Sequence, residues 1–123
     1  MHLIIKGSDL TITPSLLQYV EDKITRLGRL LPEGSPLPVS RVELARSSEH
    51  HRKGKIFYAE INLKLSGSVL LRAEAHGYDI RTAFDAARRE VQQELRKFKG
   101  RRVVRARTGA RRAKQRLRES LRA

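Results

Sequence analysis

The chain has 123 residues and a mass of 14.1 kDa, which suits one compact domain with a tail and excludes two full domains. Lys and Arg total 27 against 13 Asp and Glu, so the formal net charge is +14 and the pI about 11.2. This excess favours an anionic partner, with nucleic acid ahead of a membrane surface. The absence of cysteine excludes disulfides, thiolate zinc sites and cysteine nucleophiles. The longest apolar run is four residues, Ile56 to Ala59, so we expect no transmembrane helix or signal peptide and a soluble, cytoplasmic protein.

The positive charge is concentrated in the last quarter of the chain. Residues 1–98 contain 16 basic and 12 acidic side chains, whereas residues 99–123 contain 11 basic side chains and one acidic side chain, Glu119. The second segment has too few large apolar residues to offset the entropy of ordering it. We therefore expect a folded domain over 1–98 and a basic, flexible tail over 99–123. An arm that only improves solubility, in a chain rich in arginine, is the alternative.

A strand and a helix are the first elements expected. His2 to Gly7 includes three consecutive large aliphatic residues and is typical of a short strand. Thr13 can cap a helix, and Pro14 suits the first helical position because its missing N–H would have no partner there. Apolar residues then recur at steps of three and four, which predicts one buried helix stripe: Leu17, Val20, Ile24, Leu27 and Leu31.

Three strands are expected after a proline- and glycine-rich connection. Between Val39 and Ser47 apolar residues alternate with polar ones, with Val42 and Leu44 facing inward. The runs 57–65 and 69–76 alternate in the same way. Ser66 and Gly67 lie between those runs and are typical of a tight turn, so the two runs predict a hairpin.

A second helix closes the predicted domain. Asp79 is a candidate cap, Gly100 a stop, and the apolar face contains Ile80, Phe84, Ala87, Val91, Leu95 and Phe98. Strands one and two can be parallel because a helix joins them, whereas the later strands form an antiparallel meander. Only one face of the sheet is apolar, so both helices must cover it. We expect an α+β fold, a two-layer βαβββα sandwich with a four-stranded sheet and two helices on one face.

Basic side chains lie opposite the apolar stripes. On the first helix they are Lys23, Arg26 and Arg29, and on the second they are Arg81, Arg88, Arg89, Arg96 and Lys97. If the helices pack side by side, these residues flank one surface that can follow a phosphate backbone. The alternative is a solvated face whose cations pair with neighbouring acids such as Asp22, Asp85 and Glu90. The tail favours the first interpretation, because it adds Arg101, Arg102, Arg105, Arg107, Arg111 and Arg112.

The sequence contains no zinc-finger spacing, no basic region followed by heptads, and no aromatic strand motif for reading bases. We therefore expect recognition of structured RNA through its backbone and shape. Tyr58, on the polar side of its strand, is the candidate for stacking on a base, although it also suits a strand for structural reasons.

Catalytic and metal-binding patterns are also missing. His50 and His51 are adjacent and would chelate poorly, and His2 could meet His76 only if the edge strands allowed it. No phosphate-binding glycine loop occurs. We expect no enzymatic activity, no catalytic residue, no metal, no cofactor, no small-molecule substrate and no membrane partner.

Two segments resemble the ribosome hibernation promoting factor family, also called ribosome-associated inhibitor A or sigma-54 modulation proteins. The opening HLIIKGSDLTITPSLLQYVEDKITRL resembles that family's first strand and Thr-led helix. The segment from Ala73 to Lys99 is similar to the family's strand that ends in a glycine-x-aspartate turn, followed by an alanine, an aspartate and a basic helix end. The matching residues here are Gly77, Asp79, Ala83 and Asp85.

The resemblance covers about residues 1–99 and implies the βαβββα fold, akin to double-stranded-RNA-binding domains. It also implies that the chain binds RNA of the small ribosomal subunit in the decoding channel, blocks the messenger and transfer RNA sites and keeps ribosomes idle. Matching positions point to Lys23, Arg26, Arg29, Arg81, Arg88, Arg89 and Arg96. Long members add a second domain that pairs two copies, whereas an arginine-rich segment follows the domain here, so we expect a monomer when free.

Two other functions stay open at this point. One is a general RNA- or DNA-binding protein or chaperone that acts mainly through the tail. The other is regulation of transcription, which only the family's older name suggests.

Overall fold

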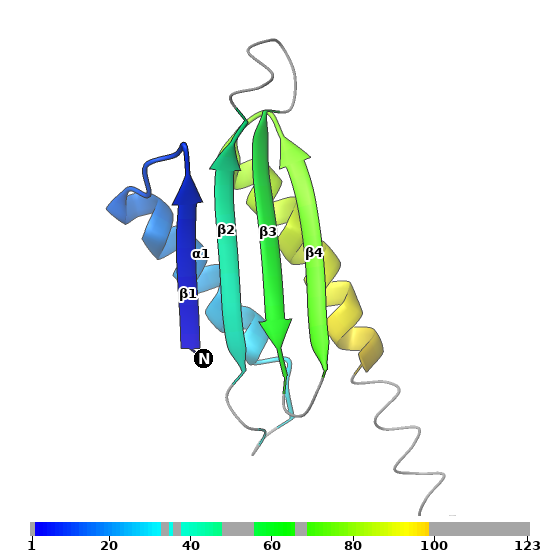
Figure 1. The fold of residues 1–123 in the computed structure, drawn as a ribbon. Helices are drawn as coiled ribbons and strands as arrows, with labels where there is room; N and C mark the ends of the chain where they lie inside the picture. The colour runs from blue at the N-terminus through cyan, green and yellow to red at the C-terminus, as the bar shows by residue number, and fades with distance from the viewer. Residues whose placement is uncertain (1, 33–34, 36–37, 48–55, 66–68, 99–123) are drawn as a thin grey trace, which may run out of the picture.

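The computed structural model describes residues 2–32, 35, 38–47, 56–65 and 69–98. The strands are β1 (His2–Ser8), β2 (Val39–Arg46), β3 (Phe57–Lys64) and β4 (Leu70–Gly77); helix α1 spans Pro14–Gly28, and a second helix spans residues 80–98. The strand order is β1-β2-β3-β4, with β1 parallel to β2 and the other neighbours antiparallel. Both helices lie on the same face of the sheet (Figure 1). The predicted two-layer βαβββα sandwich is therefore confirmed.

Both helices begin at the predicted caps. Thr13 Oγ1 accepts a hydrogen bond from the backbone N–H of Leu16 at 3.1 Å, and Pro14 occupies the first helical position. At the second helix, Asp79 Oδ1 accepts from the backbone N–H of Thr82 at 2.8 Å, and Asp79 Oδ2 accepts from the Thr82 hydroxyl at 2.7 Å. The hydrogen bond from the Thr82 N–H is the largest cause that lowers the pKa of Asp79. These caps fix the ends of the helices that cover the sheet.

The core follows the predicted stripes with one correction, at the start of α1. Leu17 was expected to be buried, but it is 37% exposed, and Leu16 occupies the core in its place. Steps of three and four both satisfy helical periodicity, so Val20 is compatible with a buried neighbour at either position. In the structure, the row Leu16, Val20, Ile24, Leu27 faces the sheet, and Leu31 packs at the edge of the core. The second helix buries Ala83, Phe84, Ala87, Val91 and Leu95.

One polar side chain lies within this core. Ser40, on the apolar face of β2, is fully buried, and its strand neighbours in register are Leu3 and Leu63. Its hydroxyl has no hydrogen-bond partner among the residues that the structure describes. A buried hydroxyl without a partner lowers stability.

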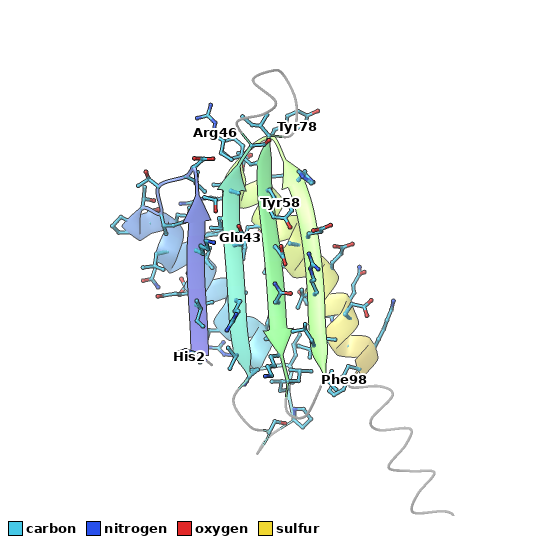
Figure 2. The ribbon with its side chains drawn as sticks, in the orientation of Figure 1. His2, Glu43, Arg46, Tyr58, Tyr78 and Phe98 are labelled. Carbon is cyan, nitrogen blue, oxygen red and sulfur yellow. The ribbon has the colours of Figure 1, made fainter. Side chains whose placement is uncertain are left out.

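The other face of the sheet is polar, as predicted, and carries a row of carboxylates. Lys6, Glu43, Glu60 and Glu74 are neighbours in register across the four strands. Figure 2 shows Glu43 and Tyr58 on this side, away from the helices. The row is only partly neutralised, since Arg72 Nε lies 3.1 Å from Glu60 Oε1 and Arg72 Nη2 lies 3.6 Å from Glu74 Oε2. We call this surface the open face.

Glu60 is the centre of the hydrogen bonds on the open face. Its Oε1 accepts from Asn62 Nδ2 at 2.9 Å, and its Oε2 lies 2.7 Å from the Tyr58 hydroxyl. The bond from Asn62, then the bond from Tyr58, lowers the pKa of Glu60. Burial raises the pKa of Tyr58, and the carboxylates of Glu60 and Glu74, which share its one hydroxyl hydrogen, raise it further. The Tyr58 ring therefore lies among carboxylates, which repel phosphate.

Several predicted features lie outside the described residues. They are the Ser66–Gly67 turn, the segment 48–55 with His50 and His51, and the tail 99–123. The expected division into a domain over 1–98 and a tail over 99–123 stays a prediction.

Replacing Ser40 with alanine tests the cost of the buried hydroxyl. Because burying such a group without a partner costs roughly 1–3 kcal/mol, we expect Ser40→Ala to raise the free energy of unfolding by about 1 kcal/mol. Urea denaturation measures the change. Ser8→Ala is the control, since the Ser8 hydroxyl does have a partner, Glu43 Oε1 at 3.3 Å, and its removal should not stabilise the fold. A lower urea midpoint for Ser40→Ala would contradict this account.

The Glu60 carboxylate makes stability depend on pH. A carboxyl whose pKa is lower in the folded state stabilises the fold above its unfolded value, here about 4.5, and that stability is lost as the pH falls through the folded pKa. We expect Glu60→Gln to be less stable than the parent at pH 7 and to approach it in stability at pH 2–3. Thermal unfolding between pH 2 and 7 measures the difference. Glu74→Gln removes a more exposed carboxylate of the same row and should cost less at pH 7; an equal difference between Glu60→Gln and the parent at every pH would refute the assignment.

Candidate nucleic-acid interface

The two helices touch through pairs of residues with the same separation in sequence. Arg81 Nη2 donates to Ser15 Oγ at 2.8 Å, and the Tyr19 hydroxyl donates to Asp85 Oδ2 at 2.6 Å. The two residues of each pair are 66 positions apart in sequence, and the second pair lies four residues after the first on both helices. Four residues are about one helical turn, so the helices run parallel and in register. The expected side-by-side packing is confirmed.

This register places the predicted cations of the two helices at similar heights. Continuing it by one more turn brings Lys23 level with Arg89, and Arg29 level with the turn that holds Arg96. The exposed side chains are Arg26 on α1, Arg29 directly after α1, and Arg81, Arg89, Arg96 and Lys97 on the second helix; Lys23 and Arg88 are half-buried. We call these eight residues the helix cations. They belong to the helical layer, which covers the side of the sheet opposite the open face (Figure 1).

The helix cations differ in how strongly other side chains engage them. Arg88 Nε lies 3.5 Å from Asp85 Oδ1, and Lys97 Nζ lies 3.4 Å from Glu94 Oε1. In the part of the chain that the structure describes, no ion pair involves the other helix cations: Lys23, Arg26, Arg29, Arg81, Arg89 and Arg96. Arg88 is the helix arginine least available to a ligand, because it is half-buried and paired.

Sequence reasoning missed Tyr19 and Ser15, two residues of α1 that join the helices. The Tyr19 ring packs edge-on against Phe84, with the ring centroids 6.1 Å apart, and its hydroxyl bonds Asp85. Arg81 Cζ lies 4.7 Å and Lys23 Nζ 5.5 Å from the Tyr19 ring centroid. The hydrogen bond to Asp85 raises the pKa of Tyr19. The sequence does contain a signal for this side of the helix, because Ser15, Tyr19 and Lys23 recur at steps of four beside the buried stripe.

Other sequence-based candidates are not brought together. His2 lies on β1 and His76 on β4, the two opposite edges of the sheet. Among the described residues, no group of three or more histidine, aspartate or glutamate side chains is placed to hold a metal ion. Tyr58 is on the open face, where its ring centroid is 5.1 Å from that of His76. Within the same described part of the chain, no helix is both long and apolar enough to cross a membrane.

Comparison with curated proteins finds relatives that share one name. The chain is 31% identical over 98 residues to the ribosome hibernation promotion factor of Deinococcus radiodurans, covering 79% of this chain and 48% of the relative. It is 31% identical over 97 residues to that of Staphylococcus aureus, covering 79% and 47%, and 28% identical over 99 residues to that of Bacillus subtilis, covering 80% and 49%. The chain thus spans about half the length of these relatives.

Solved structures match the fold. The N-terminal domain of Protein Y from Thermus thermophilus superposes with a TM-score of 0.65 at 28% identity, covering 80% of this chain and 99% of that domain. A ribosomal subunit interface protein from Coxiella burnetii has a TM-score of 0.61 at 22% identity, covering 81% and 99%, and supports the fold alone. The family described as sigma 54 modulation protein / S30EA ribosomal protein matches residues 3–103. The chain therefore belongs to the family of sigma 54 modulation proteins and S30EA ribosomal proteins.

Proposed function

We propose that this chain is a ribosome hibernation factor that acts without catalysis. It binds RNA of the small ribosomal subunit in the decoding channel, blocks the messenger and transfer RNA sites and so inhibits translation. The observation that carries the proposal is the parallel register of α1 and the second helix, which gathers the helix cations on one face. Family membership and the name shared by its relatives direct that surface to the ribosome.

Charge supplies the affinity. Helices that pack against each other have axes about 8–10 Å apart, which is within roughly one Debye length at 0.1 M salt, so both rows of cations act on the same phosphate backbone. Each phosphate that an arginine or lysine neutralises releases counterions, and binding then weakens steeply with salt. Arginine also offers a planar set of donors that matches phosphate oxygens.

Shape supplies the selectivity. The helical layer presents cations on a rigid surface backed by the core, whereas the open face carries the row Glu43, Glu60 and Glu74. An RNA-walled channel attracts the helix cations, whereas on the open face these carboxylates offset the attraction of Lys6, Arg41, Lys64 and Arg72. One orientation in the channel is therefore favoured, and the bound domain occupies space that other RNAs need.

Charge reversal on the helices tests the interface. Arg89 and Arg96 are exposed and have no ion pair among the described residues, so their replacement should leave the fold intact. We expect Arg89→Glu/Arg96→Glu to weaken binding to small ribosomal subunits by roughly 100-fold and to lower the salt dependence by about two phosphate contacts. Cosedimentation with small subunits at 50–200 mM salt measures both quantities, and an in vitro translation assay measures the loss of inhibition.

The matched control reverses the charge of two exposed basic residues on the open face. Arg41→Glu/Lys64→Glu changes the net charge by the same amount but lies on the opposite side of the sheet. It should bind small subunits within a few-fold of the parent. If both variants lost binding equally, net charge rather than the helix surface would drive the interaction.

The second candidate function is general RNA or DNA binding through residues 99–123. Its support is the composition of that segment, which has 11 basic side chains and one acidic side chain. In this alternative the folded domain is only a carrier.

Deleting residues 100–123 separates the two functions. If the helix cations form the interface, the shortened chain should bind small subunits more weakly but measurably and should keep its selectivity over bulk RNA. Sucrose-gradient fractionation, with and without competitor RNA, measures both properties. Complete loss of binding in the shortened, folded chain would favour the tail-driven alternative.

A further inference from the structure

We propose that Tyr19 organises a single phosphate-binding site between the two helices. Arg81 and Lys23 are its cationic ligands for a backbone phosphodiester, and the Ser15 hydroxyl is a third donor. The inference rests on the proposed function, because the ligand is a phosphate of the RNA that the helices contact. It adds Tyr19 as a positioning residue, which neither the charge pattern nor the family resemblance names, and it gives Asp85 the role of holding Tyr19.

The Tyr19 ring is held in place from two directions. Its edge-on contact with Phe84, which is fully buried, anchors the ring to the core. Its hydroxyl donates to Asp85 Oδ2 at 2.6 Å, which fixes the ring against the second helix. A ring with this support is a rigid surface between the two helices.

Arg81 is held by two contacts and is still exposed. Its Cζ lies 4.7 Å from the centroid of the Tyr19 ring, and its Nη2 donates to Ser15 Oγ at 2.8 Å. Among the described residues this is the only hydrogen bond of the Arg81 side chain. A guanidinium has five N–H donors in a planar fork, so most of them remain available to an anion. Because the Ser15 oxygen accepts from Arg81, its own hydrogen is available to the same anion.

Lys23 completes the site from α1. It is half-buried, and its Nζ lies 5.5 Å from the centroid of the Tyr19 ring, within the range of cation–π attraction. The Tyr19 ring thus contacts a lysine from one helix and an arginine from the other. Without the ring, the long side chains of both residues would lose more rotamer entropy on binding.

The nearby carboxylate does not cancel this charge. Asp85 Oδ2 is used by the Tyr19 hydroxyl, and Asp85 Oδ1 faces Arg88 Nε at 3.5 Å. No ion pair joins Asp85 to Arg81 or Lys23 in the described structure. Asp85 therefore positions Tyr19 and is itself balanced by Arg88, which leaves Arg81 and Lys23 free to meet a phosphate.

The test compares two replacements of Tyr19 in the full chain. Tyr19→Leu keeps an apolar side chain but removes the aromatic face, and we expect it to weaken binding to small ribosomal subunits by about tenfold. Its salt dependence should fall by about one phosphate contact. Tyr19→Phe keeps the aromatic face and loses the hydrogen bond to Asp85, so its affinity should lie between that of Tyr19→Leu and that of the parent. Thermal unfolding checks that each variant is folded.

A second parent chain distinguishes a role of Tyr19 in positioning the cations from a role in packing the helices together. In a chain that already carries Lys23→Gln/Arg81→Gln, Tyr19→Leu should cause no further loss of affinity, because the cations that it positions are gone. An equal loss in both backgrounds would mean that Tyr19 only packs the helices together, and would overturn the proposal. Unchanged affinity and salt slope for Tyr19→Leu in the parent chain would also overturn it.

These outcomes are distinct from failure of the proposed function. If the parent chain does not bind small subunits at all, the ribosomal function is wrong. If the parent binds and Arg89→Glu/Arg96→Glu does not, while Tyr19→Leu binds like the parent, the helix surface stands and only this site is wrong.

Discussion

The sheet has one apolar face, and this constraint determines where the helices and their charges lie. Two amphipathic helices must bury their stripes on the same side, because the other side carries Glu43, Glu60 and Glu74 in one row. They therefore become neighbours although about fifty residues separate them in sequence. The cations opposite their stripes then share a surface, so hydrophobic burial, rather than attraction between charged groups, assembles the proposed interface.

Gathering like charges has an electrostatic cost, and contacts between the helices offset part of it. Tyr19 attracts Lys23 and Arg81 to its ring, and Asp85 balances Arg88. The atoms that face each other in the Asp85–Arg88 pair have no hydrogen-bond partner among the described residues, so this pair is held by charge alone. These contacts stabilise a cationic surface without neutralising it, as a protein that binds a polyanion requires.

The sequence predicted the fold well because each element has a local signal. Period-two alternation, the Thr13 and Asp79 caps, and the stripes on both helices need only neighbouring residues. The misplaced Leu17 shows the limit of such signals, since helical periodicity allows either Leu16 or Leu17 beside Val20. The Tyr19–Asp85 and Ser15–Arg81 contacts were not predictable, because they depend on the axial register of two helices. Periodicity gives the face of a helix and carries no information on its height relative to another helix.

The two parts of the chain carry charge suited to different tasks, which are the attraction of RNA and the choice of a binding site on it. Residues 99–123 hold most of the net positive charge, with one acidic residue among 11 basic ones, and a segment of this kind attracts any polyanion over a distance set by salt. Residues 1–98 have a small net charge, yet the fold brings eight of their cations onto the helical layer, whereas the cations of the open face lie beside the row Glu43, Glu60 and Glu74. Cations held on one rigid surface favour one orientation over others, and the small net charge adds little to unspecific binding. The folded domain is therefore the part of the chain suited to choosing a site on structured RNA, and the basic segment is the part suited to increasing the rate at which that RNA is reached.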